Sequence, residues 1–199
     1  MFGAVSGGLV VVSGLYYFVN ICRGAARPNL TTWSLWTVIG LAILVTYRSS
    51  GAKDNVWPAV FGFINPFIIT GAAFYKHGKW EKLQAFELVC IVGCFVSLLL
   101  WGQLRNSKEL VQFALYGAIV ADFFAWLPTF DSLRKNPKED RPFPWIAFGI
   151  GYYLSIFAIT EPTFANYSLP VYMTIGSLSV AYLLGRHRVE HRSSLKHWF

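Results

Sequence analysis

The sequence predicts an all-α membrane protein with seven transmembrane helices, arranged as two parallel three-helix bundles joined by a linker helix. Composition, apolar stretches and a repeated layout all support this fold class. Of the 199 residues, 55% are hydrophobic, 18% are aromatic and only 14% are charged. A soluble domain of this length usually carries about a quarter charged residues. We therefore expect an integral membrane protein.

Seven apolar stretches are long enough to be considered as membrane spans, since a spanning helix needs roughly 20 mostly apolar residues. They are residues 2–22, 32–47, 56–75, 85–103, 110–130, 143–160 and 166–184. A closed β-barrel would need strands that alternate polar and apolar residues. Stretches such as VCIVGCFVSLLL do not alternate, so helices are expected.

A repeated layout divides the chain into two units. The segment AWLPTFDSLRKNPKEDRPFPW has a looser copy about 112 positions earlier, in which Arg23 corresponds to Lys135 and Trp33 to Trp145. The fourth stretch has no counterpart. A unit of three crossings ends on the side of the membrane opposite to the one where it began, so a second unit that followed directly would be inverted. One extra crossing between them would make the two units parallel. The expected parts are a first unit (1–82), a linker helix (83–106), a second unit (107–186) and a basic cytoplasmic tail (187–199).

The distribution of Lys and Arg predicts the orientation. One side of the membrane would hold thirteen of these residues and the other side only four, namely Arg48, Lys53, Arg105 and Lys108. By the positive-inside rule the N-terminus is outside and the C-terminus is cytoplasmic, in a plasma membrane or a bacterial inner membrane. The first positive charges follow the first apolar stretch, as expected of an uncleaved helix. Because the basic residues are divided among short loops, we expect no nucleic-acid partner.

Six tryptophans are expected near helix ends, where an indole ring can lie at the boundary between headgroups and hydrocarbon. They are Trp33, Trp57, Trp80, Trp101, Trp126 and Trp145. Trp36 lies one turn deeper and is ambiguous on this interpretation.

Two polar residues inside predicted spans are the strongest candidates for a solute site. Asn65 precedes Pro66 near the middle of the third span, where proline bends a helix and the amide needs a partner that lipid does not supply. Asp122 is the only carboxylate well inside a span, and a charge there is costly unless it is protonated, paired or hydrated. A hydrogen bond confined to the helix bundle is the alternative role for each.

Further candidates follow from the same reasoning. Tyr152 and Tyr153 place phenols in the middle of the sixth span, and Trp36 and Tyr153 are expected as aromatic walls. Pro66 and Pro128 are expected as bending points for gating.

The layout resembles the SWEET sugar transporters and the wider PQ-loop superfamily. The family's proline-glutamine pair with a basic residue some seven positions later is similar to Pro128-Thr129 with Lys135, and Tyr16-Tyr17 with Arg23 takes that place in the first unit. The resemblance implies a pocket between the two units, with an asparagine on the third helix of each. Asn65 matches that residue, whereas the second unit has Gly176 near this position.

The expected function is a transporter or permease for a small polar solute, such as a sugar or a vitamin, with alternating access around a midplane pocket. Transport would be proton-coupled if Asp122 titrates, and facilitated diffusion otherwise. The alternative is a membrane sensor or assembly protein of the same fold. The partners are the solute and the lipid bilayer, and a second copy of the chain is the protein partner that we consider.

No enzymatic activity, cofactor or metal site is expected. The four histidines all lie in loops or in the tail, and the sequence contains no H-E-x-x-H, G-x-S-x-G or P-loop pattern. A retinal-type receptor would need a lysine inside the last span, which has none.

Overall fold

The computed structural model describes residues 2–49, 56–77, 83, 85–107 and 110–199, and within these ranges the regular structure is entirely helical. The α-helices are α1 (Phe2–Cys22), α2 (Leu30–Ser49), α3 (Trp57–His77), α4 (Ala85–Leu104), α5 (Val111–Lys135), α6 (Pro142–Ile156) and α7 (Phe164–Glu190). Two short 3-10 helices follow α5 and α7, η1 (Pro137–Glu139) and η2 (Leu195–His197). The chain is therefore an all-α protein over the described residues.

Six of these helices, all except α6, are long and apolar enough to cross a membrane. The sixth span was expected to reach residue 160, but α6 has 15 residues and ends at Ile156. Past that point the backbone N–H groups of Phe157 and Ala158 bond only three residues back, to Leu154 and Ser155. Pro162 then restricts the chain before Thr163 caps the first turn of α7. At about 1.5 Å per residue, α6 is roughly 22 Å long, shorter than a hydrocarbon core of about 30 Å.

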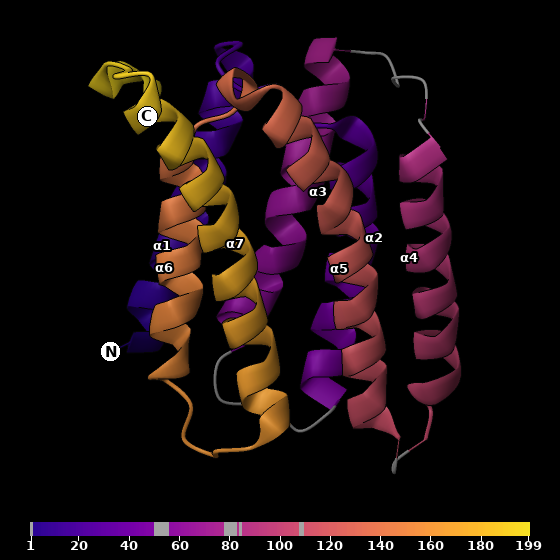
Figure 1. The fold of residues 1–199 in the computed structure, drawn as a ribbon. Helices are drawn as coiled ribbons and strands as arrows, with labels where there is room; N and C mark the ends of the chain where they lie inside the picture. Colours follow the sequence, from indigo (N-terminus) through magenta and orange to yellow (C-terminus); the bar gives the residue numbers. More distant parts are fainter. Residues whose placement is uncertain (1, 50–55, 78–82, 84, 108–109) are drawn as a thin grey trace.

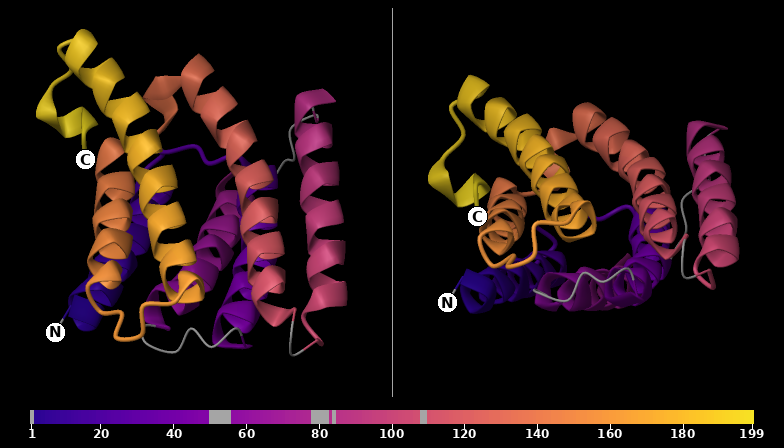
Figure 2. Two further views of the ribbon diagram at one scale, coloured as in Figure 1. Left: turned by 60° about the horizontal axis from the view of Figure 1, so that its bottom comes forward. Right: turned by 90° about the horizontal axis from the view of Figure 1, so that it is seen from below.

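Six helices form a ring, and α4 lies outside it (Figure 1, Figure 2). Helix α3 packs against both α1 and α2, and α7 packs against α6 and, less extensively, α5. The ring closes through contacts of α1 with α6 and of α2 with α5. Helix α4 packs mainly on α5, and most of its large side chains, such as Val92, Phe95 and Leu99, are exposed. Lipid is the environment in which such a surface is stable.

Glycines allow close helix contacts where polar groups must fit between helices. Pro66 has no N–H, so the Gly62 carbonyl oxygen lacks its usual partner within α3. A Cβ on Gly40 of α2 would lie 2.7 Å from that oxygen. The backbones of α2 and α3 can approach this closely only because Gly40 has no side chain.

The chain ends lie at opposite ends of the bundle, and we call the end that holds residue 199 the C-terminal end (Figure 1). There, the Arg27 backbone N–H donates to the Glu139 carbonyl at 2.9 Å and so joins the α1–α2 and α5–α6 connections. Arg188 is 3% exposed, and its guanidinium donates to the carbonyl oxygens of Pro137 and Asp140.

The last residues fold back onto this end of the bundle. Helix α7 runs past the expected boundary at residue 186 to Glu190, and the Phe143 N–H donates to the Trp198 carbonyl at 3.0 Å. The Phe143 and Phe199 rings lie 5.1 Å apart. Residues 187–199 therefore pack on the start of α6. The boundary expected at residue 82 lies outside the described residues.

Candidate functional site

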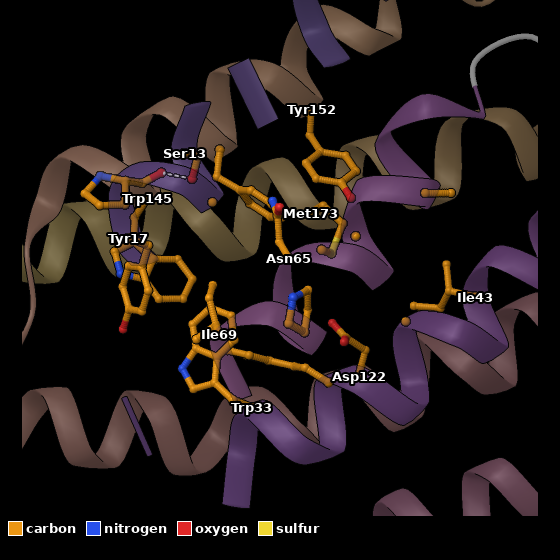
Figure 3. Close-up of a pocket in the computed structure, with 18 of the residues that line it drawn as sticks. Ser13, Tyr17, Trp33, Ile43, Asn65, Ile69, Asp122, Trp145, Tyr152 and Met173 are labelled. Atoms are coloured by element: carbon orange, nitrogen blue, oxygen red, sulfur yellow. Dashed lines mark hydrogen bonds between the residues drawn. The ribbon is translucent and has the colours of Figure 1, made fainter. Parts of the chain in front are cut away.

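A cavity lies inside the ring and receives lining residues from all six ring helices and none from α4 (Figure 3). It contains about 680 Å³ of empty space, counted together with its open mouth. Asn65, Asp122 and Tyr152, three of the residues expected to contact a solute, line this cavity together.

Four tryptophans from three helices pack against one another at the end of the cavity nearest the C-terminal end. The Trp36 ring lies 5.0 Å from both the Trp33 and the Trp126 rings, and Trp145 lies 5.7 Å from Trp126. Each of the four is at most 8% exposed. We call Trp33, Trp36, Trp126 and Trp145 the tryptophan cluster. Together with Tyr17, whose ring is 5.1 Å from Trp33, they line this end of the cavity.

This cluster corrects the expectation that Trp33, Trp126 and Trp145 lie at the lipid boundary. Trp33 and Trp145 lie in the first turns of α2 and α6, as expected, whereas Trp126 lies nine residues before the end of α5. All three are buried and face the interior of the ring. Trp57, which is 60% exposed, fits the boundary position. Trp101 is partly exposed, and Trp80 lies outside the described residues.

The Asp122 carboxylate is buried between α5 and α7 and is held by two donors. The Trp126 indole N–H donates to Oδ2 at 2.6 Å and the Tyr172 hydroxyl donates to the same oxygen at 2.8 Å. No described residue donates to Oδ1, and no described Lys, Arg or His forms an ion pair with this carboxylate. Asp122 is therefore fixed in position on the cavity wall, and its second oxygen receives no hydrogen bond from the described residues.

Asn65 lies on the opposite side of the cavity, on α3. Its Nδ2 donates to the Val10 carbonyl oxygen of α1 at 3.0 Å. Gly14 makes this geometry available, because a Cβ there would overlap the Asn65 amide. Pro66 also lines the cavity. The Asn65 amide therefore joins α1 to α3 and presents part of its surface to the cavity.

The two adjacent tyrosines of α6 point in different directions. Tyr152 is 1% exposed, lines the cavity and donates from its hydroxyl to the Pro58 carbonyl of α3 at 2.7 Å. Tyr153 is 49% exposed, and its ring lies 5.3 Å from Phe157. Neighbouring residues on a helix are about 100° apart, so when Tyr152 faces inward Tyr153 faces outward. The wall expected from Tyr153 is not part of this cavity.

Trp36 lines the cavity, and its indole N–H is buried and has no hydrogen-bond partner in the part of the chain that the structure describes. Buried donors of this kind usually have a partner. Pro128 is buried inside α5, six residues beyond Asp122 and two beyond Trp126, and is not among the described residues that line the cavity.

A second buried carboxylate, Asp140, holds the C-terminal end of the ring together. It is 4% exposed and accepts hydrogen bonds from the Tyr17 hydroxyl, the Trp145 indole and the Arg141 backbone N–H. Desolvation by burial raises the pKa of Asp140 to about 6, although these hydrogen bonds and the nearby Arg141 charge oppose the rise. Asp140 thus repeats the chemistry of Asp122, a buried carboxylate between a tyrosine and a tryptophan.

Sequence reasoning named Trp36 but missed the other three members of the tryptophan cluster, as well as Tyr17, Tyr172 and Asp140. One signal was present, because Trp33 and Trp145 occupy equivalent positions of the repeat. The Tyr17–Asp140 and Tyr172–Asp122 pairs join residues 123 and 50 positions apart, so sequence spacing could not reveal them. Among the described residues, no group of three or more His, Cys, Asp or Glu could hold a metal ion.

Comparison with known proteins adds no identification. No family model, no curated protein and no solved structure matches this chain.

Proposed function

We propose that this protein is an integral membrane transporter or permease that moves a small solute by alternating access around the ring cavity. The observation that carries the proposal is the cavity itself, which takes lining residues from each of the six ring helices. Transporters built from repeats place their substrate site between the repeats, near the midplane. Because every ring helix contributes to the wall, a relative movement of the helices would change the access to this space.

We further propose that α1–α3 and α5–α7 form two parallel three-helix units, with α4 as the linker. Exchanging the two sets reproduces the main helix contacts, because α1 meets α6 as α5 meets α2, and α2 meets α3 as α6 meets α7. Residues at equivalent positions also meet between the two sets. The Arg27 N–H donates to the Glu139 carbonyl, and the Trp33 and Trp145 rings lie 6.2 Å apart. Such contacts are expected close to an axis that relates two repeats along the membrane normal.

The two units exchange a large and a small residue at equivalent places. In the first unit, Gly14 of α1 leaves room for Asn65 of α3. In the second unit, Gly176 of α7 leaves room for the Trp126 ring of α5, since a Cβ on Gly176 would lie 3.1 Å from that ring. One unit thus gives the cavity an amide and the other an indole. The resemblance to SWEET and PQ-loop transporters is supported by this layout, and the pocket we propose is an asymmetric version of theirs.

The chemistry of the wall suggests how access would alternate. The rings of the tryptophan cluster pack against one another at the C-terminal end of the cavity, and we propose that solute leaves there only after these rings separate. We propose that Pro66 and Pro128 are the bending points, since each removes a hydrogen bond within its helix. We keep the orientation with the N-terminus outside and the C-terminus in the cytoplasm, in a plasma membrane or a bacterial inner membrane.

Uptake into proteoliposomes tests the proposal. The purified full chain is reconstituted and offered a panel of sugars, vitamins, amino acids and amines, and the variants Asp122→Asn and Asn65→Ala are compared with it. Asp131→Asn and Tyr153→Phe are matched controls, because Asp131 pairs with Lys135 at the surface and Tyr153 faces outward. We expect saturable uptake that both cavity variants reduce and both controls retain.

Two results would count against transport. Uptake unaffected by both cavity variants would remove the cavity from the mechanism. No uptake, together with no ligand-dependent change in melting temperature across the panel, would favour the alternative of a sensor or assembly protein, which needs packed interfaces but no open solute site.

A further inference from the structure

We infer that the cavity binds a small organic cation, such as a quaternary ammonium or a protonated amine, with the Asp122 carboxylate as its counter-ion and the tryptophan cluster as its aromatic wall. This inference deepens the proposed function, since it names the class of solute for the same site.

The charge balance of the cavity is the first argument. Its described lining residues include one carboxylate, Asp122, and no Lys, Arg or His. Tyr172 and Trp126 supply hydrogen bonds to that carboxylate but no positive charge. A carboxylate inside a helix bundle is costly unless it is protonated, hydrated or paired, and a cation is the partner that pairs it. A cationic ligand would supply the missing partner, whereas an anionic ligand would add repulsion and find no basic group.

The aromatic wall is the second argument. Trp33, Trp36, Trp126 and Trp145 all line the cavity, together with Tyr17. The face of an indole ring carries negative charge density and attracts cations, most strongly when water is excluded. Sites that combine several such rings are the usual way in which proteins bind quaternary ammonium groups. A single carboxylate beside a cluster of tryptophans therefore fits a cation better than either feature would alone.

The remaining hydrogen-bond capacity argues against a sugar. Ser13, Asn65 and Tyr152 each donate to a backbone carbonyl of another helix, Pro144, Val10 and Pro58 respectively. A sugar needs many polar partners to replace its water. The groups on the wall that have no hydrogen-bond partner among the described residues include the indole N–H of Trp36 and Oδ1 of Asp122. Such a donor and such an anionic oxygen match a cation that carries a single acceptor group.

The test compares two ligands of nearly equal shape that differ in charge. Choline has a quaternary nitrogen where 3,3-dimethyl-1-butanol has a carbon, and tetramethylammonium lacks the hydroxyl. Binding of labelled choline to the purified full chain in lipid nanodiscs is measured, with the other two as competitors. We expect saturable binding that tetramethylammonium displaces at a concentration at least about tenfold lower than the neutral alcohol does. Equal displacement by the alcohol, or no saturable choline binding, would overturn the inference.

Variants add a second measurement. Asp122→Asn keeps the shape but removes the charge, and we expect choline to bind about tenfold or more weakly, with no loss in Asp131→Asn. Trp36→Phe keeps an aromatic face and removes the N–H, so it should weaken choline binding more than tetramethylammonium binding. Should Asp122→Asn fail to fold, as judged by gel filtration and near-UV circular dichroism, the comparison of choline with its neutral analogue in the unmodified chain still decides.

The outcome separates this inference from the transport proposal. Charge-selective binding without uptake of any solute would leave the cation site standing and remove transport. Uptake of neutral sugars that depends on Asn65 and Asp122, and that choline does not inhibit, would leave transport standing and remove the cation site.

Discussion

Tyr152 shows how one hydroxyl connects two helices across the ring. Its bond to the Pro58 carbonyl joins α6 to α3 at the end of the cavity opposite the tryptophan cluster. We expect Tyr152→Phe to lower the free energy of unfolding by about 1 kcal/mol, because a buried hydrogen bond is lost while the ring still packs. Thermal unfolding in detergent measures this. Tyr153→Phe should leave the melting temperature unchanged, and equal effects of both variants would show that the hydroxyl bond contributes nothing.

Asp140 gives the molecule a predicted dependence of stability on pH. Its pKa is about 6 in the folded chain and 3.8 without the fold, so the folded state holds the proton more strongly. The proton on Asp140 stabilises the folded state, and this contribution to the free energy of unfolding is complete below pH 4. It amounts to up to about 3 kcal/mol and is lost as the pH rises through 6. We expect the unmodified chain to melt at a lower temperature at pH 7.5 than at pH 5.

The variant Asp140→Asn isolates this contribution. An asparagine does not titrate, so the difference in melting temperature between pH 5 and pH 7.5 should shrink, although the variant is less stable overall because an amide has one acceptor oxygen where the carboxylate has two. Asp131→Asn, a surface carboxylate on α5, serves as the comparison and should keep the full pH dependence. An unchanged pH dependence in Asp140→Asn would contradict the assignment to this residue.

Among the elements, α1 depends most clearly on a single missing side chain. A Cβ on Gly14 would overlap the amide of Asn65, which is itself bonded to Val10 of the same helix. We expect Gly14→Ala to cost about 1–3 kcal/mol, the usual range for overpacking, and to weaken solute binding by displacing Asn65. Melting temperature and ligand affinity are the two measurements.

Gly8→Ala is the matched control for that prediction. It lies on the same helix, and a Cβ there would meet no atom within 4 Å. We expect this variant to be as stable as the unmodified chain or slightly more so, since alanine is the better helix former. If both glycines tolerate alanine equally, the fit between α1 and α3 is looser than the structure indicates.

The helices were largely predictable from the sequence because the length of an apolar stretch is a local property. The expected span 2–22 coincides with α1, and 85–103 differs from α4 by one residue. Boundaries were missed where polar residues continue a helix, as in α7, which runs six residues past its expected end with Arg188 buried against the α5–α6 connection. Hydropathy marks such a residue as solvent-exposed because it does not include the carbonyl groups that another segment supplies.

The site was predictable only where a residue's chemistry conflicts with lipid. Asn65 and Asp122 were found because an amide or carboxylate in a span needs a partner. Trp33, Trp126 and Trp145 were missed because an indole expected near a helix end is equally compatible with the lipid boundary and with the interior. The direction of each ring depends on the rotation of its helix within the ring, which neighbouring helices determine and the local sequence does not.

At the scale of the whole molecule, the number of membrane crossings decides how the two ends of the cavity are used. Six helices have the length and composition of a membrane span, and α6 is shorter. Helix α6 is nevertheless part of the ring, where it packs between α1 and α7. If α6 crosses, Lys138 and Thr160 lie on opposite sides of the membrane. Both side chains are exposed.

We expect α6 to complete the seventh crossing, and cysteine labelling in sealed vesicles measures this. The three native cysteines, Cys22, Cys90 and Cys94, are first replaced by alanine. Lys138→Cys should then react with an impermeant maleimide only from the cytoplasmic side and Thr160→Cys only from the outside, with Ser193→Cys behaving like Lys138→Cys because the tail packs at the same end. Labelling of Lys138→Cys and Thr160→Cys from one side would leave six crossings, which would place both chain ends on the same side. It would also contradict the proposal of two parallel units. Without a crossing by α6, helix α7 would cross the membrane in the direction opposite to that of its counterpart α3.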